Sequence, residues 1–273
     1  MEASLSNIRK DVQMQKKSDR QMSTAWLLVY IIPLIISVVA SCYFVTVFMD
    51  LFSTVDFSLP SSSYSSYDWL PDEFMSVWII VMLTGAANSV ATLTLNYLLV
   101  NRRATHFKRQ NFLHEDTIST IGSIAKTKEI DMDADLSSLQ RTLKEANIEK
   151  TEKSAILWSI LSMFVPFVQL YVYYFLVNDF YRHERIEDSF WADVSTAMNK
   201  LDINFSMPRR TEAMPYRSFV LYLILSIVTM GLFVVYWLYA LLKDPNTHFK
   251  YHTQTENQLL TVLESATTQE TPC

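Results

Sequence analysis

Hydrophobic residues gather in four long runs along this chain, and charged residues are confined to the segments between them. Residues 25–48, 75–100, 155–177 and 219–242 each contain no charged side chain. A helix needs roughly 20 apolar residues to cross the hydrocarbon core of a bilayer, and every run is that long. A core helix of a soluble protein would keep a charged face, which these runs lack. The pattern therefore predicts an all-α, polytopic membrane protein with four transmembrane helices.

The polar segments carry a second pattern, which predicts juxtamembrane helices in the cytoplasm. Leucines recur at helical spacing over 135–149, where Asp135 is suited to cap the start of a helix. Similar amphipathic helices are expected at about 104–125 and 246–265. The apolar stripe of such a helix needs a partner: the membrane surface, another juxtamembrane helix, or another protein.

The distribution of Lys and Arg indicates how the chain is oriented. Only 19% of all residues are charged, yet the tail 1–23 carries five basic residues and segment 101–153 carries ten, whereas loop 50–74 carries none. Positively charged segments stay in the cytoplasm, so we expect loop 50–74 outside the cell and the two basic segments inside. Transmembrane helices one and two then lie within 24–100, in a protein of the plasma membrane whose N- and C-termini are both cytoplasmic.

Two arrangements fit residues 154–242. With four full spans, the polar segment 178–217 lies outside although it carries six basic residues. Alternatively, runs three and four are re-entrant hairpins that break at Pro166 and Gly231, and every basic segment stays inside. A hairpin limb of about 12 residues reaches only about 18 Å, and its turn would expose backbone groups to lipid. We therefore favour four spans, followed by a cytoplasmic helix and tail over 243–273.

A short motif recurs where three of the four runs end. Each copy has a Tyr-x-Leu exit and a His shortly beyond the polar boundary, and the copies are 77 and 65 residues apart from His to His. This spacing predicts an internal repeat that arose by duplication. The repeated residues are Tyr97, His106, Tyr174, His183, Tyr239 and His248.

The histidines of this motif are interpreted as amphipathic side chains at the headgroup boundary. His248 and His252 share one face of a helix, but a metal site needs three or four converging ligands. The four-span arrangement puts His183 on the opposite side of the membrane from His106 and His248. We therefore predict no metal ion and no other cofactor.

The end of the last run resembles a known family. The stretch IVTMGLFVVYWLYALLKDPNTHF (227–249) has a Thr-x-Gly, an aromatic Tyr-Trp-x-Tyr exit and an acidic-Asn pair. It is similar to an uncharacterised family of small prokaryotic membrane proteins, a domain of unknown function. The resemblance implies a prokaryotic membrane protein, and it implies no known activity and no catalytic residue. The matching residues are Thr229, Gly231, Tyr236, Trp237, Tyr239, Asp244 and Asn246.

A polar stripe runs along the second span. Thr84, Asn88, Thr92 and Asn96 recur every four residues and so share one helix face. One interpretation is packing against neighbouring helices, with Gln169, or Ser37 and Ser41, as bonding partners. The other is the lining of a polar route or ligand site.

Function is predicted mainly by exclusion. The four runs contain no ionisable side chain, and the chain shows no Ser/His/Asp set, paired carboxylates or Gly-rich phosphate loop at plausible spacing. We expect no enzyme, no catalytic residue and no binding of nucleic acid. The preferred prediction is an integral membrane scaffold or assembly protein. Its cytoplasmic amphipathic helices would bind a membrane or cytoplasmic protein, or a second copy. The alternative is a small channel or transporter component that uses the polar stripe.

Overall fold

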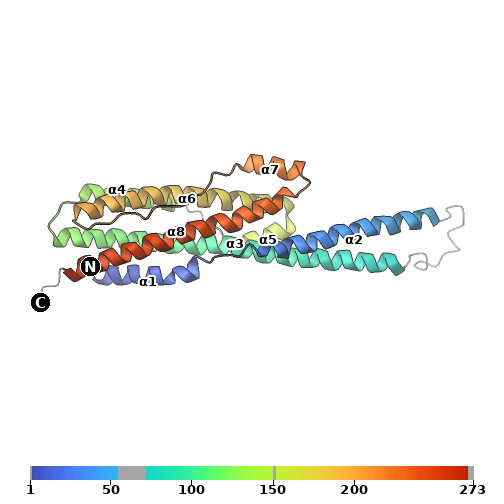
Figure 1. The fold of residues 1–273 in the computed structure, drawn as a ribbon, viewed down its shortest axis with the longest axis horizontal. Helices are drawn as coiled ribbons and strands as arrows, with labels where there is room; N and C mark the ends of the chain where they lie inside the picture. The colour runs from blue at the N-terminus through green and yellow to red at the C-terminus, as the bar shows by residue number, and fades with distance from the viewer. Residues whose placement is uncertain (1, 55–71, 150–151, 270–273) are drawn as a thin grey trace. The chain divides into compact units, whose positions relative to one another are not determined.

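The computed structural model describes residues 2–54, 72–149 and 152–269, and every regular element in these ranges is an α-helix. The predicted all-α class is confirmed. Most of the expected outside loop 50–74 lies outside the described residues. The helices (Figure 1) are α1 (Glu2–Ser18), α2 (Trp26–Thr54), α3 (Asp72–Thr127), α4 (Asp133–Glu149), α5 (Ala155–Phe164), α6 (Pro166–Lys200), α7 (Phe219–Val228) and α8 (Phe233–Gln269).

The chain divides into two compact units, and α3 belongs to both. Unit 1 comprises Met1–Thr24 with Asn96–Cys273, and unit 2 comprises Ala25–Leu95. The expected span 75–100 and the expected cytoplasmic helix 104–125 are therefore one continuous helix. No Pro or Gly interrupts the chain between them, so nothing in the sequence stops the helix at the polar boundary.

Unit 2 is a pair of apolar helices, α2 and the first half of α3. They pack side by side, and the rings of Phe44 and Phe74 lie 4.9 Å apart. Two segments in the described ranges, Trp26–Asp50 and Phe74–Thr127, are long and apolar enough to cross a membrane. Almost none of the residues in their most apolar stretches is buried, which distinguishes them from the core helices of a soluble protein.

Runs three and four are not continuous helices, so the expectation of a single helix through each of them is wrong. Run three is divided at Val165, whose extended backbone (φ −122°, ψ 103°) separates α5 from α6. Run four is divided between Val228 and Phe233. Helices α5 and α7 have 10 residues each, about 15 Å of length, which is half of a hydrocarbon core. Both runs are divided where the hairpin alternative places its breaks, at Pro166 and around Gly231.

The second turn shows why such a reversal is tolerated. Met230 has a left-handed backbone (φ 51°), its N–H bonds the carbonyl of Ile227 at 3.0 Å, and the N–H of Gly231 bonds the carbonyl of Ser226 at 2.7 Å. This is a Schellman motif. The Thr229 hydroxyl then accepts from the N–H of Phe233 at 2.9 Å. These bonds satisfy several of the backbone groups at the turn, which lowers the cost that such a turn would have in lipid.

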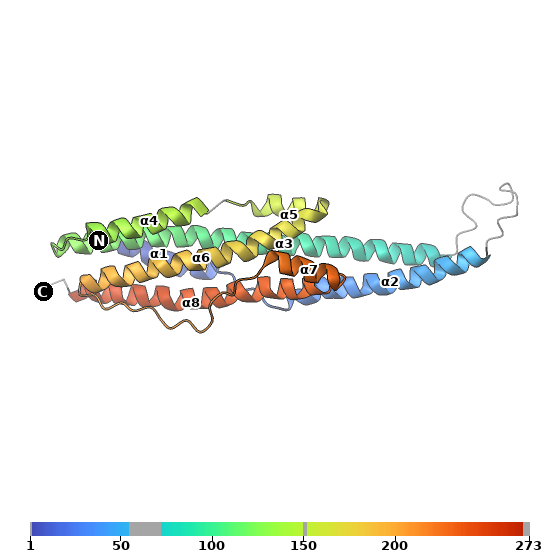
Figure 2. The ribbon, with the colours of Figure 1, turned by 90° about the horizontal axis from the view of Figure 1, so that it is seen from above.

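Unit 1 is a bundle in which α3, α6 and α8 run in the same direction, with α1 and α4 beside them (Figures 1 and 2). After each of α3 and α6 the chain returns along the bundle before the next long helix begins. One return is helical, through α4, and the other is the segment 201–218, which contains no helix.

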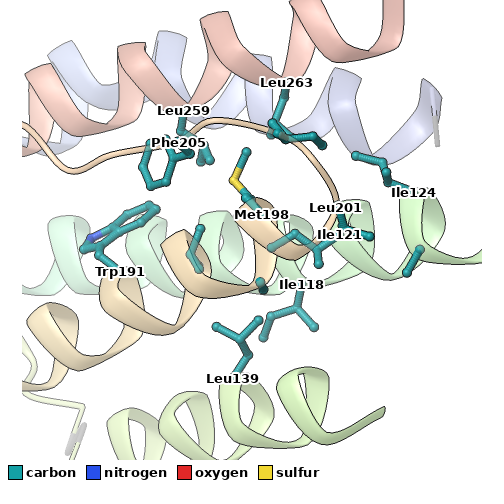
Figure 3. Packing of buried hydrophobic residues seen from close by; sticks show 14 of the residues in the cluster. Ile118, Ile121, Ile124, Leu139, Trp191, Met198, Leu201, Phe205, Leu259 and Leu263 are labelled. Atoms are coloured by element: carbon teal, nitrogen blue, oxygen red, sulfur yellow. The ribbon is translucent and has the colours of Figure 1, made fainter. Parts of the chain in front are cut away.

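The core of the bundle is formed by the apolar faces of these helices (Figure 3). Side chains from α3, α4, α6 and α8 meet in one cluster, which includes Ile118, Ile121, Ile124, Leu139, Trp191, Met198, Leu201, Phe205, Leu259 and Leu263. The stripe of the predicted helix 135–149 is therefore covered by other helices of unit 1. That helix begins at Asp133, where the Asp131 carboxylate accepts from the Asp133 N–H at 3.1 Å, so Asp135 is not its cap.

A proline inside α8 is matched by an arginine on α3. Pro245 has no N–H, so the carbonyl of Leu241 one turn earlier loses its helical partner. The buried guanidinium of Arg102 donates to that carbonyl instead, and it also donates to Asn246 at 3.3 Å. Asn246 in turn bonds the backbone of Met22 at 2.7 and 3.0 Å, which ties the start of the chain to α8.

Candidate functional site

The three histidines of the repeated motif meet inside unit 1. His106 comes from α3, His183 from α6 and His248 from α8. The ring centroids of His106 lie 5.2 Å from those of both His183 and His248, which are 5.8 Å from each other. All three side chains are buried. The expectation that His183 lies apart from the other two is wrong, because α6 starts from a hairpin and runs in the same direction as α3 and α8.

The next helical turn adds a second polar layer. Positions four residues after each histidine are Gln110, Glu187 and His252, and all three are buried. His252 Nε2 lies 2.8 Å from Glu187 Oε2, and His252 Nδ1 lies 2.7 Å from Gln110 Nε2. Glu256 is one turn further along α8 and contacts both Gln110 (2.5 Å) and His252 (3.4 Å).

Carboxylates hold the outer nitrogen of two of the three histidines. Asp19, which follows α1, lies 2.9 Å from His106 Nδ1, and Glu184 lies 3.0 Å from His248 Nδ1. Each carboxylate is paired with an arginine. Arg109 lies 2.8 Å from Asp19 and also 2.6 Å from Glu256, and Arg210 lies 2.7 Å from Glu184. The histidine rings are therefore fixed in orientation by charged groups on several helices.

The inner nitrogens of these rings face one another and a carboxylate. His106 Nε2 and His248 Nε2 are 3.3 Å apart, and Glu187 lies 2.9 Å from His183 Nε2 and 3.4 Å from His248 Nε2. Although they are close, His183 Nε2 and both Glu187 oxygens have no hydrogen bond of acceptable geometry with any described residue. One ligand atom from each of these four side chains falls within 4.8 Å of all the others.

Burial and neighbouring charges set the protonation of this centre. Burial lowers the pKa of His183 well below its usual value, and burial together with the charge of His252 lowers the pKa of His248 to about 4. Burial alone would also lower the pKa of His252, but Glu187 and Glu256 raise it to about 10. Burial opposes charge on Glu187, yet the adjacent histidines hold its pKa well below the usual range. Neutral His183 and His248 therefore lie beside an ionised Glu187.

The tyrosines of the motif do not join the centre. Tyr97 and Tyr174 are exposed, and Tyr239 is half-buried. The leucines two residues later, Leu99, Leu176 and Leu241, are all buried instead. Each copy of the motif therefore directs its Leu and His into the bundle and turns its Tyr outward.

The polar stripe of the second span is used unequally along its length. Asn96, the first residue of α3 in unit 1, donates to Ser162 at 2.7 Å and to Gln169 at 2.6 Å. Gln169 is one of the partners expected for this stripe. The Thr84 hydroxyl bonds the backbone of its own helix at 2.7 Å. The carbonyl oxygen of Asn88 is buried with no partner among the described residues.

Sequence reasoning missed three carboxylates of the centre, Glu187, Asp19 and Glu184. Glu187 stands four residues after His183, as His252 does after His248, and this shared spacing was the available signal. Asp19 and Glu184 have no such signal, because only the fold brings Asp19 to α3 and Glu184 to α8. Arg109 has none either, because its partners Asp19 and Glu256 lie far from it in the sequence.

Residues of the Thr-x-Gly and acidic-Asn motifs have structural contacts. Thr229 and Gly231 form the hairpin turn before α8. Asp244 pairs with Arg217 at 2.5 and 2.9 Å, and Arg217 also donates to Tyr222 at 2.5 Å. This network ties the start of α7 to α8 and closes the second hairpin at its base.

A family model described as a domain of unknown function, DUF4234, matches residues 217–269. The match begins at Arg217 and covers α7, the hairpin turn and α8, so it includes His248, His252 and Glu256. It fits the resemblance to an uncharacterised family. No curated protein and no solved structure matches the chain.

Proposed function

We propose that the protein is a non-enzymatic scaffold or assembly protein anchored in the plasma membrane. The observation that carries the proposal is the apolar surface at the hairpin turns of unit 1. Phe164, Phe167, Val228 and Met230 are between 72% and 95% exposed. Large apolar side chains gathered at two turns in this way mark a membrane or protein contact, and none of the four lies near a charged residue in the chain.

The proposed topology has two spans and two hairpins. Helix α2 and the first half of α3 cross the bilayer, and the α5–α6 and α7–α8 hairpins enter it from the cytoplasmic side without crossing. Both termini and the segment 178–217 are then cytoplasmic. This arrangement places all the Lys and Arg segments inside, which four full spans do not.

The bundle leaves two surfaces for partners. The apolar faces of the cytoplasmic helices are occupied by one another, so a soluble partner would bind the polar outer surface of unit 1. A membrane protein or a second copy would bind the hairpins or α2 within the bilayer. The centre of His and Glu side chains is sealed in the bundle, which favours a structural role over catalysis.

The topology is tested by cysteine labelling in intact cells. In a chain with Cys42 and Cys273 replaced by Ser, a cysteine at exposed Ala213 should react with an impermeant maleimide only after permeabilisation. A cysteine at Ser265 should behave in the same way, and one at Ser62 should react without permeabilisation. Labelling of position 213 in intact cells would restore the four-span arrangement.

The scaffold role itself is tested by native purification in mild detergent. We expect a stoichiometric complex with another protein or a second copy of the chain, retained after cross-linking. A lone monomer that conducts ions in a planar bilayer would contradict the scaffold proposal.

A channel or transporter component is the second proposal, and Asn88 is the residue that favours it. Its unpartnered carbonyl oxygen would be satisfied by water in a polar route. If so, cysteines at 88 and 92 should react with a small polar thiol reagent. A cysteine at Val90, which is 64% exposed on the opposite face, should stay inert in lipid. The Asn96 bonds to Ser162 and Gln169 favour packing, so we expect no reaction at 88 or 92.

A further inference from the structure

The inner face of the histidine centre has the form of a tetrahedral ligand set. With metal–nitrogen distances of about 2.0–2.1 Å, two ligands of a tetrahedral zinc ion are separated by about 3.3 Å. His106 Nε2 and His248 Nε2 are 3.3 Å apart, and His248 Nε2 and Glu187 Oε2 are 3.4 Å apart. Two imidazole nitrogens at this separation repel as lone pairs unless a proton or a cation lies between them.

The unpartnered atoms are an independent observation that points into the same space. His183 Nε2 and both oxygens of Glu187 are buried, lie close together and lack an aligned hydrogen bond with any described residue. Leaving such groups unsatisfied in a protein interior is unfavourable, and most of all for a charged carboxylate. A cation at the point where the four side chains converge would satisfy His183 Nε2 and one of the two Glu187 oxygens.

The outer contacts are those of metal-binding histidines. A ligating histidine almost always donates its other ring N–H to a carboxylate, a backbone carbonyl or water, which fixes the tautomer and makes the ligand more basic. Asp19 holds His106 Nδ1 and Glu184 holds His248 Nδ1, so both rings are fixed with Nε2 directed inward. Arg109 and Arg210 in turn hold these two carboxylates.

We propose that His106, His183, Glu187 and His248 bind one Zn²⁺ ion. Three imidazoles and one carboxylate are ligands that zinc accepts, and four protein ligands leave no open position for substrate. The ion joins α3, α6 and α8 at one level and has a structural role. This inference does not depend on the scaffold function, since a channel could use the same ion in the same way.

Metal analysis of the full chain purified in detergent tests the proposal. The metal is first removed with a chelator, and Zn²⁺ is then added back and the excess washed out. The wild-type protein should then hold one Zn²⁺ per chain. With Co²⁺ in place of zinc, it should show the visible absorption of a tetrahedral site at one equivalent, and Zn²⁺ should abolish that absorption. His183→Gln and Glu187→Gln should lose the bound ion, and helix content measured by circular dichroism shows whether they are folded.

His114→Gln is the matched control. His114 is also a buried histidine on α3, but it stacks on Phe190 with ring centroids 3.8 Å apart and lies outside the ligand set. This variant should keep the ion. Asp19→Asn should keep the stoichiometry but weaken zinc affinity about 10- to 100-fold, as expected of a positioning residue. A wild-type protein with no stoichiometric zinc and no tetrahedral Co²⁺ spectrum would overturn the proposal. So would His183→Gln and Glu187→Gln variants that hold as much zinc as the wild type.

Discussion

Asp11 on α1 is a single carboxyl group that opposes the folding of the bundle. Burial, and then the charge of Asp116, raise its pKa to about 6, although Arg109 acts in the opposite direction. The folded state therefore holds the proton more tightly than the unfolded state. Stability is greatest with the carboxyl protonated, and it is lost as the pH rises from about 4 to about 6.

Asp11→Asn should remove this cost. We expect the variant to be more stable than wild type at pH 7 by roughly 1 kcal/mol, a value reduced because the half-buried side chain is screened by solvent. The difference should vanish below about pH 3, where the wild-type carboxyl is largely protonated in both states. Thermal unfolding in detergent at the two pH values measures it. Glu145→Gln, the same kind of change at an exposed carboxyl, is the matched control for loss of a carboxylate.

A contact between two side chains could be predicted from the sequence only where both residues stood out as polar positions within apolar runs. Asn96 belongs to the polar stripe on run two, Gln169 on run three was one of the two sets of partners expected for that stripe, and the two side chains bond. The histidine centre was not foreseen, although its three histidines had been aligned as a repeat. The alignment left the direction of α6 open, and the incorrect choice of direction separated His183 from the others.

Among the elements, the ends of the long helices share one design. Glu129 after α3 and Asp202 after α6 have left-handed backbones, with φ of 55° and 57°. In both, the following isoleucine bonds back to a carbonyl five residues earlier, at 3.0 and 2.9 Å. These are Schellman motifs, in which Gly is the preferred residue at the left-handed position.

Glu129→Gly should therefore stabilise the protein by roughly 1 kcal/mol, because glycine adopts this backbone without strain. Lys126→Gly is the same kind of exposed change one turn earlier, inside α3, and it should destabilise by about the same amount. Unfolding midpoints of the two variants in detergent give the comparison. A loss of stability in both would show that the left-handed position carries no strain.

The hydrophobic pattern predicted where the apolar helices lie, but it did not predict whether a run forms one continuous helix or two. Each run is long enough for a span, and the break in run three depends on a single extended residue before Pro166. Proline is also tolerated inside helices, as Pro33 in α2 and Pro245 in α8 show, so its presence does not determine a turn. What decides is whether the turn can satisfy its backbone groups, and that depends on local geometry rather than on hydrophobicity.

For the whole molecule, the separation of the chain into two units predicts that unit 1 folds without unit 2. We expect a chain that joins Thr24 to Asn96 through a flexible linker of about 15 Gly and Ser residues to unfold cooperatively. It should still sediment with membranes through its hairpins. Replacing Phe164, Phe167, Val228 and Met230 by Ser should release it to the soluble fraction with its helix content unchanged. Release without these four substitutions would contradict insertion of the hairpins.

The parallel arrangement of α3, α6 and α8 also has a consequence in time. His106 and His248 touch each other although 142 residues separate them in the chain. At a synthesis rate of about 5–20 residues per second, the nascent chain waits roughly 7 to 28 s between making the first of these histidines and the last. Asp19 is already present when that interval begins, Arg109 and Glu187 are added during it, and His252 and Glu256 are still to be made when it ends. The charged interior is therefore the last part of the molecule that can close, and a ribosome that stalls before α8 leaves it open to water.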